Sequence, residues 1–162
     1  MNKKSIFLTI AIGALFFSGC GDDEFHAKHN QGKNCLECHS FKGGGTIFKS
    51  IDAKDYDEKM AARGYNIQLL LKDGTIIKYS KGNGYGNRKY SGNIDNIGNF
   101  TAQIVDQNGT VVNHSRENSH NIDRLACNRC HTKDGANGAP GRVVNFNFYD
   151  NNQNFGLSSI QE

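Results

Sequence analysis

The middle of the chain contains apolar runs separated by turn residues, a pattern that predicts β-hairpins. In NIQLLLKDGTIIKYS, residues 66–80, two apolar runs lie on either side of Asp73-Gly74. An Asp-Gly dipeptide between such runs favours a tight turn, because glycine adopts the positive φ angles that the turn requires. We therefore predict a hairpin whose strands are residues 67–71 and 76–79.

A second hairpin is predicted in GNFTAQIVDQNGTVVNHS, residues 98–115. Residues 100–105 and 111–112 are its apolar runs, and Asn108-Gly109 is its turn. The same Asn108-Gly-Thr sequence fits an N-glycosylation acceptor, so the residue types leave a sugar at Asn108 open as an alternative.

The flanking stretches complete the prediction of a mainly β protein. GGTIFKSIDA, residues 44–53, predicts a strand, and the Gly-, Asn- and Tyr-rich residues 81–93 predict a loop. DAKDYDEKMAARG, residues 52–64, predicts one short helix that ends at its glycine. We expect a small β-sandwich core over residues 43–113. The Gly-x-Phe at residues 98–100 is similar to the start of a late strand in Ig-like and transthyretin-like modules, which implies the same architecture.

The first residues have the pattern of an export signal. Lys3 and Lys4 precede the largely apolar residues 6–17. That run is shorter than the roughly 20 residues that cross a bilayer, so it predicts a cleaved signal peptide over residues 1–19.

The end of this signal, Ser18-Gly19-Cys20, resembles the lipobox of bacterial lipoproteins, although Phe17 stands where that family prefers leucine. The resemblance implies that Cys20 carries lipid and that residues 20–34 tether the domain to a membrane. Gly21 after the cysteine favours the outer membrane over the inner one. An ordinary cleaved signal with an unpaired Cys20 is the alternative.

Charge and composition exclude one class of partner. The chain of 162 residues has a formal charge of +3, and removal of residues 1–19 leaves 17 basic against 16 acidic residues. The net charge is therefore close to zero, and Lys and Arg do not cluster in a basic stripe. Nucleic acid is not expected as a partner. The 19 glycines and single proline predict a loop-rich domain that a large apolar cofactor would help to stabilise.

The most informative pattern is a phrase that occurs twice. HNQGKNCLECH ends in Cys35-x-x-Cys38-His39, and HNIDRLACNRCH ends in Cys127-x-x-Cys130-His131. Cys-x-x-Cys-His is the attachment site of c-type haem, where two thiols form thioethers to one porphyrin edge and the histidine binds the iron. The sequence therefore resembles dihaem c-type cytochromes, which implies two covalently bound haems, one at each motif.

Cys-x-x-Cys pairs also occur in zinc sites and in redox-active dithiols. Zinc sites built from two such pairs usually place them about 15–20 residues apart, whereas 88 residues separate Cys38 from Cys127. A redox dithiol would not need a histidine directly after the second cysteine in both copies. Both alternatives are weaker than haem attachment.

Histidine is the expected ligand on the far side of each iron. His29 and His120 begin the two phrases, six and seven residues before the first cysteine of their motifs. Such an upstream histidine resembles the distal ligand of multihaem cytochromes. Whether each serves its own haem or the other one is left open, and His26 and His114 stay as alternative ligands.

These patterns predict one dihaem domain over residues 35–162 that carries electrons between redox partners in the cell envelope. Two histidine-ligated irons favour electron transfer, since an iron with an open position binds small molecules or reacts with peroxide. The alternatives are a peroxidase-like haem enzyme with one open iron and a subunit of a larger multihaem assembly, including self-assembly.

Overall fold

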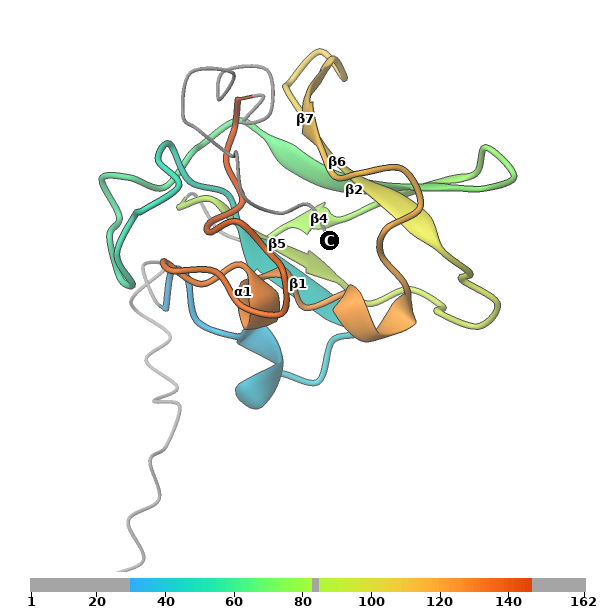
Figure 1. Ribbon diagram of the computed structural model, residues 1–162, viewed down its shortest axis with the longest axis horizontal. Helices are drawn as coiled ribbons and strands as arrows, with labels where there is room; N and C mark the ends of the chain where they lie inside the picture. The colour runs from blue at the N-terminus through green and yellow to red at the C-terminus, as the bar shows by residue number, and fades with distance from the viewer. Residues whose placement is uncertain (1–29, 83–84, 147–162) are drawn as a thin grey trace, which may run out of the picture.

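The computed structural model describes residues 30–82 and 85–146, and in these ranges the protein is mainly β, as predicted (Figure 1). Two antiparallel sheets form the domain. The first has the order β1-β5-β4, with β1 at Gly43–Thr46, β5 at Asn87–Tyr90 and β4 at Ser80–Lys81. The second has the order β3-β2-β6-β7, with β3 at Ile76–Lys78, β2 at Asn66–Leu71, β6 at Phe100–Val105 and β7 at Val111–His114.

Both predicted hairpins are confirmed. β2 pairs with β3 around a turn in which Gly74 has a φ of +84°, and β6 pairs with β7 around Gly109 with a φ of +86°. The Asp106 carboxylate accepts hydrogen bonds of 2.8 Å from the backbone of Asn108 and of Thr110. The turn residues therefore adopt the conformation for which their sequence is suited.

The core lies between the sheets and under the segment that leads into the second motif. Tyr79 is buried in this core, and its hydroxyl donates a 2.8 Å hydrogen bond to the carbonyl of Leu125. Other buried members of this core are Ile47, Ala62, Ile67, Leu69, Ile97, Phe100 and Ile104. The core thus connects the four-stranded sheet to the residues directly before Cys127.

Two local predictions were wrong. Residues 81–93 contain strand β5, which pairs with the glycine-rich β1 and places Arg88 in the interior. Residues 52–64 form turns and no helix: Lys49 donates to the carbonyl of Met60, and Ala62 donates to the carbonyl of Ile47. The backbone of this segment bonds to residues 47–49, so these groups are not available for helical bonds within it.

Within the described ranges, helical structure occurs only as single turns: the 3₁₀ turns η1 (Cys35–Glu37) and η2 (Ile122–Arg124) and the α-helix α1 (Cys127–Cys130). η1 and α1 coincide with the two Cys-x-x-Cys motifs. The α-helix that the structure shows in these ranges is therefore the single turn at the second motif, and it is not the helix predicted over residues 52–64. No helix in the described residues is long and apolar enough to cross a membrane.

One buried arginine connects the segments around both motifs. The side chain of Arg142 is 1% exposed, and its guanidinium pairs with the Asp55 carboxylate. It also donates to the carbonyls of Ala53 at 2.9 Å, Gly32 at 3.0 Å and His131 at 3.1 Å. A buried cation needs this degree of compensation, because an unpaired one would be strongly destabilising.

Asp55→Asn should lower the free energy of unfolding by about 2–3 kcal/mol at pH 7, because it leaves Arg142 buried without its counterion. Urea unfolding measures the change. The matched control is Asp134→Asn, which removes the exposed Asp134–Lys133 pair and should cost less than about 1 kcal/mol. Equal effects of the two substitutions would contradict the assignment of Arg142 as the anchor.

Candidate functional site

The two Cys-x-x-Cys-His motifs each form a single helical turn, a 3₁₀ turn in the first and an α-helical turn in the second, and both pack against β1 (Figure 1). In the first, the backbone N–H of His39 donates to the carbonyl of Cys35 at 3.1 Å; in the second, His131 donates to Cys127 at 2.9 Å. One helical turn therefore brings the histidine back over the first cysteine in each motif. Segments that are far apart in the sequence are therefore neighbours in the fold.

Three consecutive glycines make this approach to β1 feasible. A Cβ atom on Gly44 would lie 3.2 Å from the Cys35 sulfur, and a Cβ on Gly45 would lie 2.9 Å from the Cys127 sulfur. Successive residues of a strand point to opposite faces. β1 therefore carries the first cysteine of one motif against one face and the first cysteine of the other motif against the opposite face.

The cysteines differ in their chemical state. Cys35, Cys127 and Cys130 are free thiols, and Cys38 is disulfide-bonded. Burial raises the pKa of Cys127 to about 12, and the nearby Cys35 raises it further; burial also raises the pKa of Cys35. Both thiols are protonated at neutral pH. A thioether at Cys38 requires reduction of its disulfide first.

The structure brings His120 and His131 together. Their ring centroids are 6.4 Å apart and their planes are within 6° of parallel. The Nδ1 atom of His131 lies 2.8 Å from the carbonyl of Gly141, and the Nδ1 atom of His120 lies 3.0 Å from the Ser119 hydroxyl. These contacts involve Nδ1 of both rings, so Nε2 is the nitrogen of each ring that could bind a metal.

The rings are stacked, and their centroid separation is of the size that two imidazoles on opposite sides of one metal ion would have. A metal–imidazole bond is about 2 Å long. With the further distance of about 1 Å from each nitrogen to its ring centre, two ligands on one axis place their centroids roughly 6 Å apart. The hydrogen bond from a ligating histidine to a backbone carbonyl, as in His131, is the usual way in which proteins orient such a ligand.

The backbone fixes His120 in this position. Phe100, the first residue of β6, exchanges two hydrogen bonds with His120, of 2.9 and 3.2 Å, and their rings stack with centroids 5.8 Å apart. Burial, the neighbouring His131 and Arg124 lower the pKa of His120 to about 4, and burial lowers the pKa of His131. Both imidazoles are therefore neutral at pH 7, the form that binds a metal.

The first motif is more open to solvent. His39 is exposed, and its ring stacks on Phe41 with centroids 4.9 Å apart. Its predicted partner His29 lies outside the described residues, as do His26 and Cys20. His114 is exposed on β7, with its Nδ1 2.8 Å from the carbonyl of Ser115.

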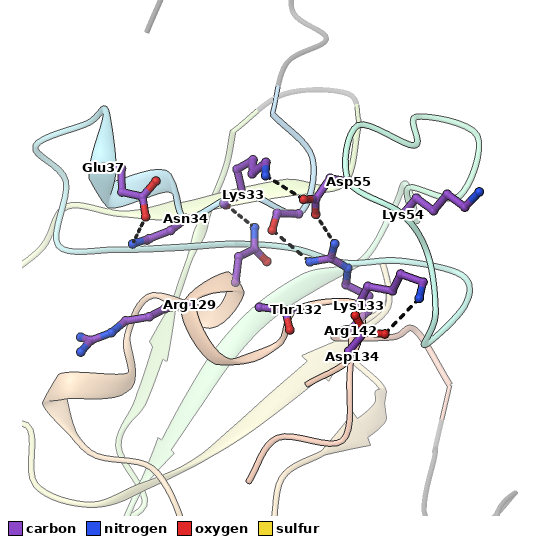
Figure 2. Close-up of a pocket in the computed structure, with 12 residues that line it drawn as sticks. Lys33, Asn34, Glu37, Lys54, Asp55, Arg129, Thr132, Lys133, Asp134 and Arg142 are labelled. Atoms are coloured by element: carbon purple, nitrogen blue, oxygen red, sulfur yellow. Dashed lines mark hydrogen bonds and ion pairs between the residues drawn. The ribbon is translucent and has the colours of Figure 1, made fainter. Parts of the chain in front are cut away.

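A cleft of about 470 Å³ separates the first motif from the loop that follows the second (Figure 2). Figure 2 shows Lys33 and Arg142 directed toward Asp55, whereas Arg129 extends away from this group. Lys33 pairs with Asp55 at 2.8 Å. Lys33 and Arg142 on this cleft thus already pair with a carboxylate of the protein.

Several residues of this site have no sequence signal that singles them out. Asn128, Ser119 and Gly141 hydrogen-bond to residues of the two repeated phrases, and the sequence patterns do not mark them. No group of three or more His, Cys, Asp or Glu side chains in residues 30–82 and 85–146 is arranged to hold a metal ion. The arrangement that the structure does show is a pair of histidines beside a Cys-x-x-Cys turn.

Comparisons with protein-family models, curated proteins and solved structures find no significant match to this chain.

Gly44→Ala and Gly45→Ala should each lower the free energy of unfolding by about 1–3 kcal/mol, because the added methyl displaces a packed cysteine. Chemical denaturation measures the effect. Gly98→Ala is the control: a Cβ on Gly98 meets nothing within 4 Å, so the change should stay within about 0.5 kcal/mol. If both β1 variants match the control, the cysteines do not depend on close approach to this strand.

The haem-free protein should lose stability as the pH falls from about 6.5 toward 4. The pKa values of His120 and His131 are lowered on folding, so the unfolded chain binds more protons in this range and acid favours unfolding. The stability that His120 and His131 contribute through their lowered pKa values is fully present above about pH 6.5. His120→Phe should make the decline shallower and leave the part due to His131, while His114→Phe, at an exposed histidine, should leave the profile unchanged. A decline as steep in His120→Phe as in the unmodified protein would contradict the assignment.

Proposed function

We propose that this protein is a dihaem c-type cytochrome that carries electrons in the cell envelope. The observation that supports this most strongly is the pair of parallel histidines beside the second Cys-x-x-Cys turn. Cys127 and Cys130 would form the thioethers of that haem, and His131 and His120 would be its axial ligands. In this proposal His120 serves the haem of its own phrase.

The first motif would hold the second haem in the same way. Cys35 and Cys38 would form its thioethers once Cys38 is reduced, and His39 would be the proximal ligand. The support is the matching helical turn, in which both histidines bond back to the first cysteine of the motif. His29 is the proposed distal ligand by analogy with His120.

The surroundings of the histidine pair favour electron transfer over chemistry at the iron. When bound, haem iron with two axial histidines supplies one-electron oxidation and reduction. The side chains that contact His120 include an aromatic ring, a hydroxyl and the second imidazole, from Phe100, Ser119 and His131, and Arg124 is close enough to lower its pKa. They orient and shield the ligand. A peroxidase-like site would need an acid or base directed at an open iron position.

The difference in exposure between the motifs suggests an order for the electron path. His39 and the residues around it are exposed, whereas His131 and His120 are partly buried. We propose that a redox partner in the envelope docks at the first motif and that the second haem is the inner one. A lipid on Cys20 would hold the domain at a membrane, with the outer membrane favoured, and the chain would act alone or within a larger multihaem assembly.

The experiment is a haem count combined with a spin-state measurement. Protein matured with haem should carry two covalently bound haems per chain. His120→Ala should convert one of the two from low spin to high spin, because it removes one axial ligand, and optical and resonance Raman spectra report this change.

His114→Ala is the matched control and should leave both haems low spin. One or no covalent haem in the unmodified protein, despite a reducing maturation system, would overturn the proposal. A fully low-spin His120→Ala variant would reject His120 as the ligand.

A further inference from the structure

Asn128 occupies one of the two variable positions of the second Cys-x-x-Cys motif, yet it is buried. Its exposure is 3%, while Arg129, in the other variable position, is exposed. A polar residue at a variable position has no need to be buried for haem attachment. Its burial therefore requires a separate explanation.

Hydrogen bonds use both donors and the acceptor of the Asn128 amide. Its oxygen accepts from the backbone N–H of Thr46 at 3.0 Å. Its nitrogen donates to the carbonyl of Lys33 at 2.7 Å and to the hydroxyl of Thr46 at 3.1 Å. Lys33 lies two residues before Cys35, so one side chain connects the second motif directly to the segment that leads into the first.

Thr46 extends this connection. It is 0% exposed, and its hydroxyl accepts from the backbone N–H of Gly32 at 3.1 Å and donates to the Asn87 side chain at 2.6 Å. The segment before the first motif, the end of β1, strand β5 and helix α1 thus meet at two buried polar side chains. Such a network is costly to disturb, since each group left unpaired would stay buried.

The two motifs that this network connects are close together. Neighbouring Cβ positions of a strand lie about 6 Å apart. Together with the contacts of Gly44 to the Cys35 sulfur and of Gly45 to the Cys127 sulfur, this places the two sulfurs within about 12 Å of each other. At this separation and an effective dielectric constant of about 20, one unit charge would change an equilibrium about tenfold. The irons lie beyond the sulfurs, so about tenfold is the upper limit of the coupling between the haems.

We propose that Asn128 is a positioning residue that locks the two haem attachment segments in one relative placement and thereby sets the electrostatic coupling between the haems. This inference rests on the proposed function. It predicts that loss of the amide lets the segments move apart without removing any ligand or thioether. Reduction of one haem should then affect the other less.

The test compares Asn128→Leu and Thr46→Val with two controls, Arg129→Gln and Thr46→Ser. Leucine and valine keep the approximate volume but lose the hydrogen bonds, whereas serine keeps the hydroxyl. Spectroelectrochemical titration measures the interaction between the two reduction steps, and EPR of the oxidised protein measures the magnetic interaction between the irons. Haem content and thermal unfolding are recorded for every variant.

Both network variants should keep two haems, lose at least half of a coupling that is at most about tenfold, and show a weaker magnetic interaction between the irons. Both controls should match the unmodified protein. Two haems with unchanged coupling in Asn128→Leu and Thr46→Val would overturn the inference, even if both variants melt earlier, because that result describes a residue that only stabilises the fold. If Asn128→Leu does not fold, the difference in haem–haem coupling between Thr46→Val and Thr46→Ser tests the inference alone. Unmodified protein without two haems would reject the proposed function, and this inference with it.

Discussion

The close approach of two chain segments to one short strand is the constraint on which the rest of the structure depends. β1 has glycine at three of its four positions, and this absence of side chains lets Cys35 and Cys127 pack directly on its backbone. Glycine weakens a strand, because it contributes no packing and loses more entropy on folding. Here the cost is offset because the two motifs can both pack on one strand. β1 pairs with β5 along one edge, and the backbone of Gly44 donates to the carbonyl of Leu125 along the other.

Burial and hydrogen bonding then convert this packing into a defined site. His131 is held at three atoms: its N–H by Cys127, its carbonyl by Arg142 and its Nδ1 by Gly141. His120 is held by the start of β6 in the other sheet. The two imidazoles thus come from opposite layers of the domain, and their separation is set by the packing of the sheets. This explains why a small, glycine-rich domain can present preorganised ligands, a requirement for a site that must keep its geometry while its charge changes.

The sequence predicted the features that depend on local rules. The hairpins at Asp73-Gly74 and Asn108-Gly109 follow from turn chemistry, and the repeated phrase contains His120 and His131, which the structure places side by side. The prediction from sequence was wrong where tertiary contacts determine the structure. Residues 52–64 have a helix-forming composition, but their backbone bonds to residues 47–49. Residues 81–93 have a loop-like composition, but they contain β5, which pairs with the edge of β1. The buried positions of Asn128 and Arg142 were not predictable either, since a buried polar side chain is recognised by its partners, and most of these lie 82 to 110 residues away in the sequence.

The central claim is that both irons would be held between two histidines in one compact domain. A low-temperature EPR spectrum of the oxidised, haem-loaded protein tests it most directly. The account predicts low-spin ferric signals that represent both irons, broadened by the interaction between neighbouring haems, with no high-spin component. A high-spin signal of substantial intensity would contradict it, because it would show that one iron lacks a second axial ligand and is open to exogenous molecules.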